Sequence, residues 1–78
     1  MRKADYSPKI RLYPREKEVL ILMSQGFSNN AIGEQLGIRV VMVKNYYRQA
    51  RQKIIPIGET WSKEQVLAYA EEHKLLDP

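Results

Sequence analysis

One segment of the chain concentrates side chains that could bind a nucleic acid. Residues 38–54 hold five basic residues and no acidic residue, together with Asn45 and two tyrosines. The basic residues are Arg39, Lys44, Arg48, Arg51 and Lys53. Guanidinium and ammonium groups bind phosphates, and Arg, Lys and Asn side chains also hydrogen-bond to base edges. The segment therefore suits DNA recognition, although a solvated basic helix face would have a similar composition.

Residue types for other chemistry are scarce. The absence of cysteine excludes disulfides, thiolate nucleophiles and the usual structural zinc sites. His73 is the only histidine, and the serines have no local arrangement typical of an activated nucleophile. The glycines are scattered rather than grouped in a phosphate-binding loop. We expect no enzyme activity, no catalytic residue, no metal and no cofactor.

Charge is distributed unevenly along the 78 residues. Residues 1–15 carry five bases and one acid, whereas residues 59–78 carry five acids and two lysines. This asymmetry favours a polyanion bound on one side of a single small domain. The sequence begins with Met1 and has no apolar run long enough for a membrane span, so we expect a complete chain in the cytoplasm.

Four helices are expected, at about residues 14–25, 29–36, 39–54 and 63–73. Pro14 suits the first position of a helix, and Ser28 is a natural N-cap for the second. Pro56 stops the third helix, and Ser62 with Gln65 has the spacing of a capping box for the fourth. Residues 1–11 are expected to form a basic arm and residues 12–78 the folded domain.

The third helix has a regular apolar stripe. Its members recur at steps of three, four, three and four: Val40, Val43, Tyr47, Ala50 and Ile54. Such spacing predicts a buried face, which leaves the other side chains off the core. The residues expected off the core are Arg39, Met42, Lys44, Asn45, Tyr46, Arg48 and Arg51.

The spacing of Gly33, Gly37 and Val43 is typical of a helix-turn-helix. Gly33 would lie under a close helix crossing that Val43 fills, and Gly37 would allow the positive φ needed to leave the second helix. We expect Gly33→Ala to be tolerated and Gly33→Leu to overpack the crossing. The alternative is that the glycines only interrupt or end the helices of a simple helical hairpin.

Residues 12–20 (LYPREKEVL), 25–29 (QGFSN), 36–38 (LGI) and 43–46 (VKNY), with Ile32 between them, resemble the LuxR/GerE-type DNA-binding domain of bacterial transcription regulators. The resemblance is strong over about residues 12–54 and resumes near residues 68–76. It implies an all-α, four-helix helix-turn-helix domain preceded here by a basic N-terminal arm. In length the chain looks most like a stand-alone regulator of the GerE kind.

The resemblance also implies functional residues. It places Lys44, Asn45 and Arg48 where the family contacts bases, with the third helix in the major groove. The expected DNA backbone contacts are Asn29, Asn30, Arg39, Met42, Tyr46 and Arg51. The fourth helix is expected to form a homodimer through Val66, Leu67, Tyr69 and Ala70.

Several residues depart from the family pattern. Tyr13 stands where a capping Thr is usual, Ala31 replaces a usual Glu, and Arg39 with Val40 replaces a usual Ser-Glu pair. The loop before the fourth helix is about four residues longer than usual and contains Trp61. Dimer geometry is therefore the expectation that the resemblance supports least.

The leading hypothesis is a sequence-specific, double-stranded DNA-binding transcription regulator, nucleoid-associated and encoded by a bacterium or a phage. The alternative is a small regulator, for example from a mobile element, that uses the same scaffold to bind RNA polymerase or another transcription factor. Exposed Val41, Met42 and Tyr46 would favour that alternative. Nonspecific nucleic-acid binding is a third reading. The operator sequence, the sign of regulation and the host pathway are not encoded in these patterns.

Overall fold

The computed structural model describes residues 10–76 and contains four helices and no strand within that range. The helices are α1 (Pro14–Ser24), α2 (Asn29–Leu36), α3 (Val40–Ile54) and α4 (Lys63–Glu72). The all-α prediction is confirmed. The small differences from the expected ranges arise because Gln25, Arg39 and His73 are cap residues rather than helical ones.

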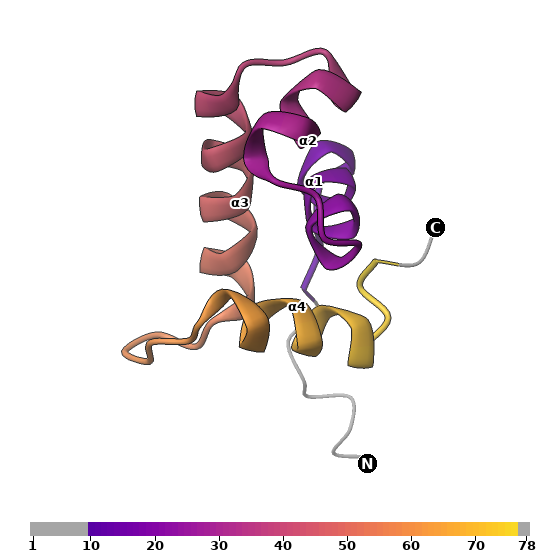
Figure 1. Cartoon of the computed structure of the whole chain (residues 1–78). Helices are drawn as coiled ribbons and strands as arrows, with labels where there is room; N and C mark the ends of the chain where they lie inside the picture. The colour runs from indigo at the N-terminus through magenta and orange to yellow at the C-terminus, as the bar shows by residue number, and fades with distance from the viewer. Residues whose placement is uncertain (1–9, 77–78) are drawn as a thin grey trace.

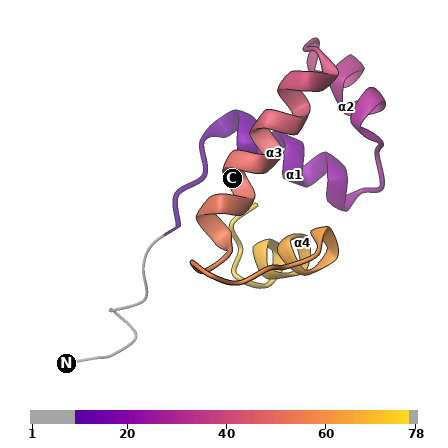
Figure 2. The same ribbon diagram turned by 90° about the vertical axis from the view of Figure 1, so that its left-hand side faces the viewer.

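The long helix α3 is the element on which the others assemble (Figure 1). It contacts α1, α2 and α4, and α4 also contacts α1. Figure 2 shows α1 and α2 against the upper part of α3, with α4 beneath the lower part. The N-terminal end of α3 therefore lies far from α4.

The core takes residues from every helix. Its buried members are Val19, Leu20 and Met23 of α1, Ile32 of α2, Val43, Ala50 and Ile54 of α3, and Val66 and Ala70 of α4. The predicted stripe on α3 is confirmed at its three core positions, whereas Val40 and Tyr47 are only half-buried. Val40 is less buried because it lines a groove between α2 and the start of α3.

Packing begins before Leu12. Ile10 and Leu12 both pack against the core, so the expected arm over residues 1–11 includes a residue that belongs to the folded part. Residues 1–9 of that arm lie outside the described residues.

Side-chain caps begin three of the helices. Ser28 Oγ accepts a hydrogen bond from the Ala31 N–H at 3.1 Å. Ser62 and Gln65 form the predicted capping box, in which each side chain accepts from the other residue's backbone N–H. At α1, Tyr13 cannot supply the hydroxyl of a short capping side chain, but Glu16 Oε1 accepts from the Tyr13 N–H at 3.0 Å.

Gly33 and Gly37 shape the turn between α2 and α3. Gly37 has φ of 70°, the left-handed conformation expected of it. A Cβ added to Gly33 would lie 2.8 Å from the Ile38 carbonyl oxygen and 3.7 Å from a Val43 methyl group. The close crossing is therefore present, and this contact argues against the expectation that alanine is tolerated at Gly33. The obstructing atom belongs to the backbone of the turn, which cannot move aside as a flexible side chain could.

Candidate nucleic-acid interface

The outer face of α3 brings together the residues expected to contact bases. Lys44 and Arg48 are exposed and Asn45 is half-buried. Arg48 Nη2 donates a hydrogen bond to Asn45 Oδ1 at 2.6 Å. Because residues three apart are neighbours on a helix, this bond holds the amide and the guanidinium side by side on the surface. Sequence reasoning placed both residues but did not anticipate their pairing, although the spacing allows it.

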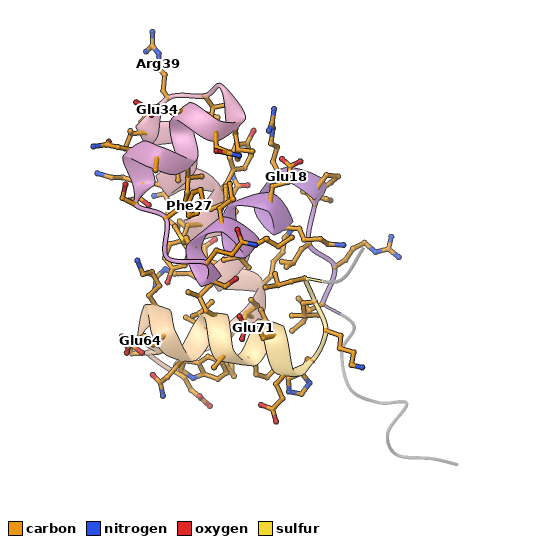
Figure 3. All side chains as sticks on the ribbon, turned by 45° about the vertical axis from the view of Figure 1, so that its right-hand side comes forward. Glu18, Phe27, Glu34, Arg39, Glu64 and Glu71 are labelled. Carbon is orange, nitrogen blue, oxygen red and sulfur yellow. The ribbon has the colours of Figure 1, made fainter. Side chains whose placement is uncertain are left out.

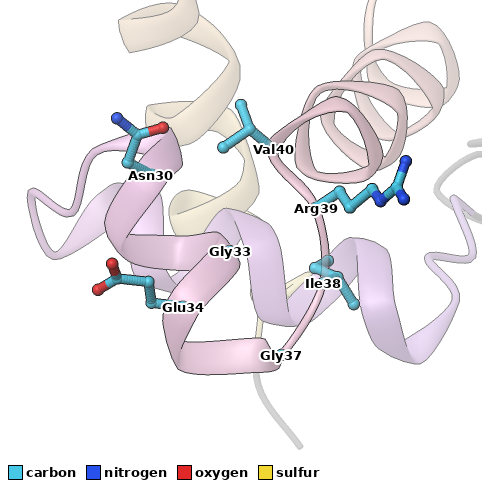
Figure 4. A pocket seen from close by; sticks show the side chains of 7 residues that line it. All are labelled: Asn30, Gly33, Glu34, Gly37, Ile38, Arg39 and Val40. Atoms are coloured by element: carbon cyan, nitrogen blue, oxygen red, sulfur yellow. The ribbon is translucent and has the colours of Figure 1, made fainter.

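A second part of the candidate interface lies where α2 meets the start of α3. Asn30, Glu34 and Arg39 line an open groove there, with Gly33 at its floor (Figure 4). Figure 4 shows Asn30 and Glu34 on the α2 side and Arg39 on the side of the turn. Arg39 is exposed and Asn29 is half-buried at the first position of α2. Ala31 leaves the first turn of α2 without an acidic residue, which favours an anion at the helix N-terminus, and Glu34 is the carboxylate that lies closest along α2.

Tyr46 and Arg51 are less accessible for contact with a DNA backbone than their sequence positions indicated. Tyr46 is half-buried and packs against the core, so the expectation that it lies off the core is wrong. Arg51 is half-buried near Tyr47. Burial raises the pKa of the Tyr47 phenol above its ordinary value, and the positive charge of Arg51 opposes that shift. Met42 is exposed beside these residues on α3.

Lys53 is engaged within the fold rather than at the DNA-facing surface. Its Nζ lies 2.7 Å from Glu16 Oε1, donates to the Arg11 carbonyl oxygen at 3.2 Å and lies 3.8 Å from the centre of the Tyr13 ring. Four of the five bases in residues 38–54 therefore remain for a polyanion. Local sequence patterns could not predict this role, because Glu16 and Lys53 are far apart along the chain.

Arg39 and the carboxylates of α4 lie at opposite ends of the molecule (Figure 3), and Glu34 lies beside Arg39. Figure 3 shows Arg39 at one end and the α4 residues Glu64 and Glu71 at the other. A polyanion would be attracted to the end formed by α2 and the start of α3 and repelled by the carboxylates of α4. The charge asymmetry of the sequence therefore becomes a spatial asymmetry of the fold.

Helix α4 differs from the expected dimer surface in part. Val66 and Ala70 are 0% exposed and belong to the core of this chain, so the expectation that they contact a partner is wrong. Leu67 and Tyr69 are half-buried and retain some accessible surface. Because α4 is short, each of its turns is needed to cover the end of the core. The most apolar face of α4 is therefore buried within this chain.

An aromatic row that sequence reasoning missed lies along α4. The Trp61 and Tyr69 rings are 5.4 Å apart, and the His73 ring stacks on Tyr69 at 4.0 Å. Trp61 Nε1 donates to Glu59 Oε1 at 2.8 Å, which holds the loop residue in place. Tyr69 and His73 are four residues apart on one helix face, but the position of Trp61 depends on the loop.

No helix in residues 10–76 has the length and apolar character required to cross a membrane. Comparisons with curated proteins and with solved structures found no significant match. Comparison with known protein families matches residues 11–55 to GerE, described as bacterial regulatory proteins of the luxR family. The match covers more than half of the chain, includes α1 to α3 and ends before α4. The chain therefore belongs to the luxR family of bacterial regulatory proteins, a family of DNA-binding transcription regulators with a helix-turn-helix.

Proposed function

We propose that this protein binds double-stranded DNA in a sequence-specific manner to regulate transcription, with α3 in the major groove. The observation that carries the proposal is the paired Asn45 and Arg48 on the outer face of α3, next to exposed Lys44. Arg and Lys suit the O6 and N7 acceptors of guanine, whereas Asn suits the N6 and N7 edge of adenine. The protein acts on the DNA of a bacterial or phage genome in the cytoplasm.

The remaining contacts position the helix on the phosphates. Asn29 and Asn30 occupy the first turn of α2, where unpaired backbone N–H groups and the helix dipole favour an anion. Arg39 and Arg51 supply positive charge on either side of the base-reading residues. Met42 and the exposed part of Tyr46 would pack against the sugar-phosphate backbone.

Selection of bound duplexes from a random pool tests the proposal directly. The expected result is a defined motif whose affinity exceeds that for random duplex by about 10³-fold or more. A control selection with the Lys44→Ala/Arg48→Ala double variant should not recover the same motif. A parent protein that enriches no motif would refute sequence-specific regulation.

We further propose a weak homodimer formed through the exposed side of α4. Tyr69, the accessible part of Leu67 and the neighbouring Trp61 offer apolar and aromatic surface, and an isologous pair would bury it twice. Two copies of α3 would then face half-sites related by a dyad, about one helical turn apart. The surface is small, so DNA is expected to strengthen the association.

A second candidate function is supported by the same region. The aromatic row of Trp61, Tyr69 and His73 runs along α4, the helix that carries Glu64, Glu71 and Glu72. Such a surface suits a protein partner, for which RNA polymerase or another regulator is the proposed class. In this role the protein would associate with its partner in the absence of DNA, and the duplex selection would yield a flat profile.

A further inference from the structure

Val41 is an exposed apolar residue at the start of the helix that faces DNA. It lies in the first turn of α3, and 55% of its surface is accessible. The neighbouring Val43 fills the core beneath the helix crossing, so α3 does not need Val41 for its packing. A β-branched residue is also a poorer helix former than the Lys, Arg or Gln usually found on an exposed helix face. Neither packing nor helix formation accounts for valine at this position.

Helical spacing places Val41 beside the base-reading pair. Val41, Asn45 and Arg48 are separated by four and then three residues, so they lie on one face of α3. That face is opposite to Val43, Ala50 and Ile54, which enter the core. Val41 precedes Asn45 by about 6 Å along the helix axis, roughly the rise of two base pairs. Any duplex that brings bases to Asn45 and Arg48 also brings a base pair close to Val41.

The major groove offers one apolar group, the 5-methyl group of thymine. A valine side chain has no hydrogen bond to offer a base edge, and it would leave polar base edges without partners. A methyl group in contact with the Val41 methyls would instead remove apolar surface from water on both sides. Thymine is therefore the base whose chemistry fits this position.

We propose that Val41 contacts the 5-methyl group of a thymine adjacent to the base pairs read by Asn45 and Arg48, and so makes the protein selective for that thymine. This assignment rests on the proposed function of α3 in the major groove. The proposal does not extend to Met42. Met42 is one residue further round the helix and lies off the face that Val41, Asn45 and Arg48 share.

Replacement of thymine by deoxyuridine tests the contact, since it removes the methyl group and leaves base pairing unchanged. Each thymine of the selected site is replaced in turn, and affinities are measured for the parent protein and for Val41→Ala. We expect one position at which deoxyuridine weakens parent binding about fourfold, the effect of one methyl group leaving a buried contact. Val41→Ala should bind the thymine and deoxyuridine forms of that position equally.

Matched controls separate this contact from general effects. Val41→Ile should retain the discrimination, because it keeps the branched Cβ and one of the two γ-methyl groups of valine. Ile57→Ala should also retain it, since Ile57 is a fully exposed apolar residue in the loop after α3. Circular dichroism would show that the Val41 variants keep the helical content of the parent.

The possible results distinguish this proposal from the proposed function. A specific motif with no thymine that responds to deoxyuridine, or a response that persists in Val41→Ala, overturns the contact and leaves sequence-specific binding intact. If selection recovers no motif, the proposed function fails and the contact fails with it. A loss of affinity in Val41→Ala for a protein partner, with unchanged DNA binding, would assign the residue to the alternative function.

Discussion

The ammonium group of Lys53 on α3 lies 2.7 Å from the carboxylate of Glu16 on α1, and Glu16 is only 1% exposed. The same Glu16 oxygen accepts from the backbone N–H of Tyr13, and the Tyr13 ring lies against Lys53. The pair therefore joins the start of α1 to the last turn of α3. Lys53 belongs to the most positive segment of the chain, but it stabilises the position of α3 rather than binding DNA.

Lys53→Ala is expected to reduce the free energy of unfolding by about 1–3 kcal/mol, because it leaves a buried carboxylate without its charged partner. The loss should be smaller in Glu16→Gln/Lys53→Ala, which removes the buried charge as well. Chemical denaturation of both variants and of Glu16→Gln gives the coupling energy of the pair. Specific DNA affinity should fall little once the folded fraction is taken into account. Equal stability of Lys53→Ala and the parent would contradict this structural role.

Lys44→Ala and Arg48→Ala are each expected to weaken specific binding by about 1–3 kcal/mol and to relax the preference at particular base pairs. Arg48→Ala also removes the hydrogen bond to Asn45, so its effect should extend to the base pair that Asn45 reads. Binding to a panel of single-base-pair variants of the selected site measures both effects. Lys63→Ala, an exposed lysine on α4, is the matched control. Equal losses on specific and random duplexes would show that Lys44 and Arg48 contact phosphates only.

Gly33→Ala provides a sharp test of the helix crossing, because two effects predict opposite signs. In an unobstructed helix, alanine in place of glycine stabilises by about 1 kcal/mol. At Gly33 the new Cβ would instead press on the Ile38 carbonyl oxygen, and we expect a net loss of about 1–3 kcal/mol. The thermal unfolding of Gly33→Ala is compared with that of Glu34→Ala, a substitution at an exposed neighbour on α2. The comparison separates the effect of crowding at the helix crossing from the effect of helix propensity. A variant that melts above the parent would show that the turn relaxes at no cost.

Local signals predicted the helices well because each depends on residues close in sequence. Ser28, Gly37 and the Ser62–Gln65 pair act within one turn of a helix, and the structure gives them the expected cap conformations. The residues that the sequence could not assign depend on tertiary contacts. Glu16 and Lys53 meet only when α1 packs on α3. Val66 and Ala70 are core residues because α4 packs against both α1 and α3. Val41 and Met42 are exposed as expected, whereas Tyr46, expected to be exposed with them, packs against the core.

Alkaline pH is expected to destabilise the fold partly through Tyr47. Burial raises the pKa of its phenol above the unfolded value of about 10, so the neutral form is favoured in the folded state. The unfolded chain therefore releases its proton first, and stability present below pH 10 is lost as the pH rises toward the folded pKa. Denaturation at a series of pH values from 8 to 12 should show a shallower decline for Tyr47→Phe than for the parent. Parallel declines would indicate that Tyr47 has the same pKa in both states.

The proposed dimer can be tested without disturbing the core. Leu67 packs partly on the core, so a charge there could unfold the domain, whereas Ala68 is exposed and lines a groove with Trp61 and Tyr69. In Ala68→Glu, the new carboxylates would face one another across a dyad and add to the negative charge of α4, while Tyr69, which also packs partly on the core, is left unchanged. We expect sedimentation to show a monomer, and binding to a two-fold site should lose its cooperativity while half-site binding is retained.

Glu64→Gln is the matched control on the same helix. If the folded Ala68→Glu variant binds the two-fold site as tightly and cooperatively as the parent, α4 does not form the dimer. Its aromatic row must then serve another partner.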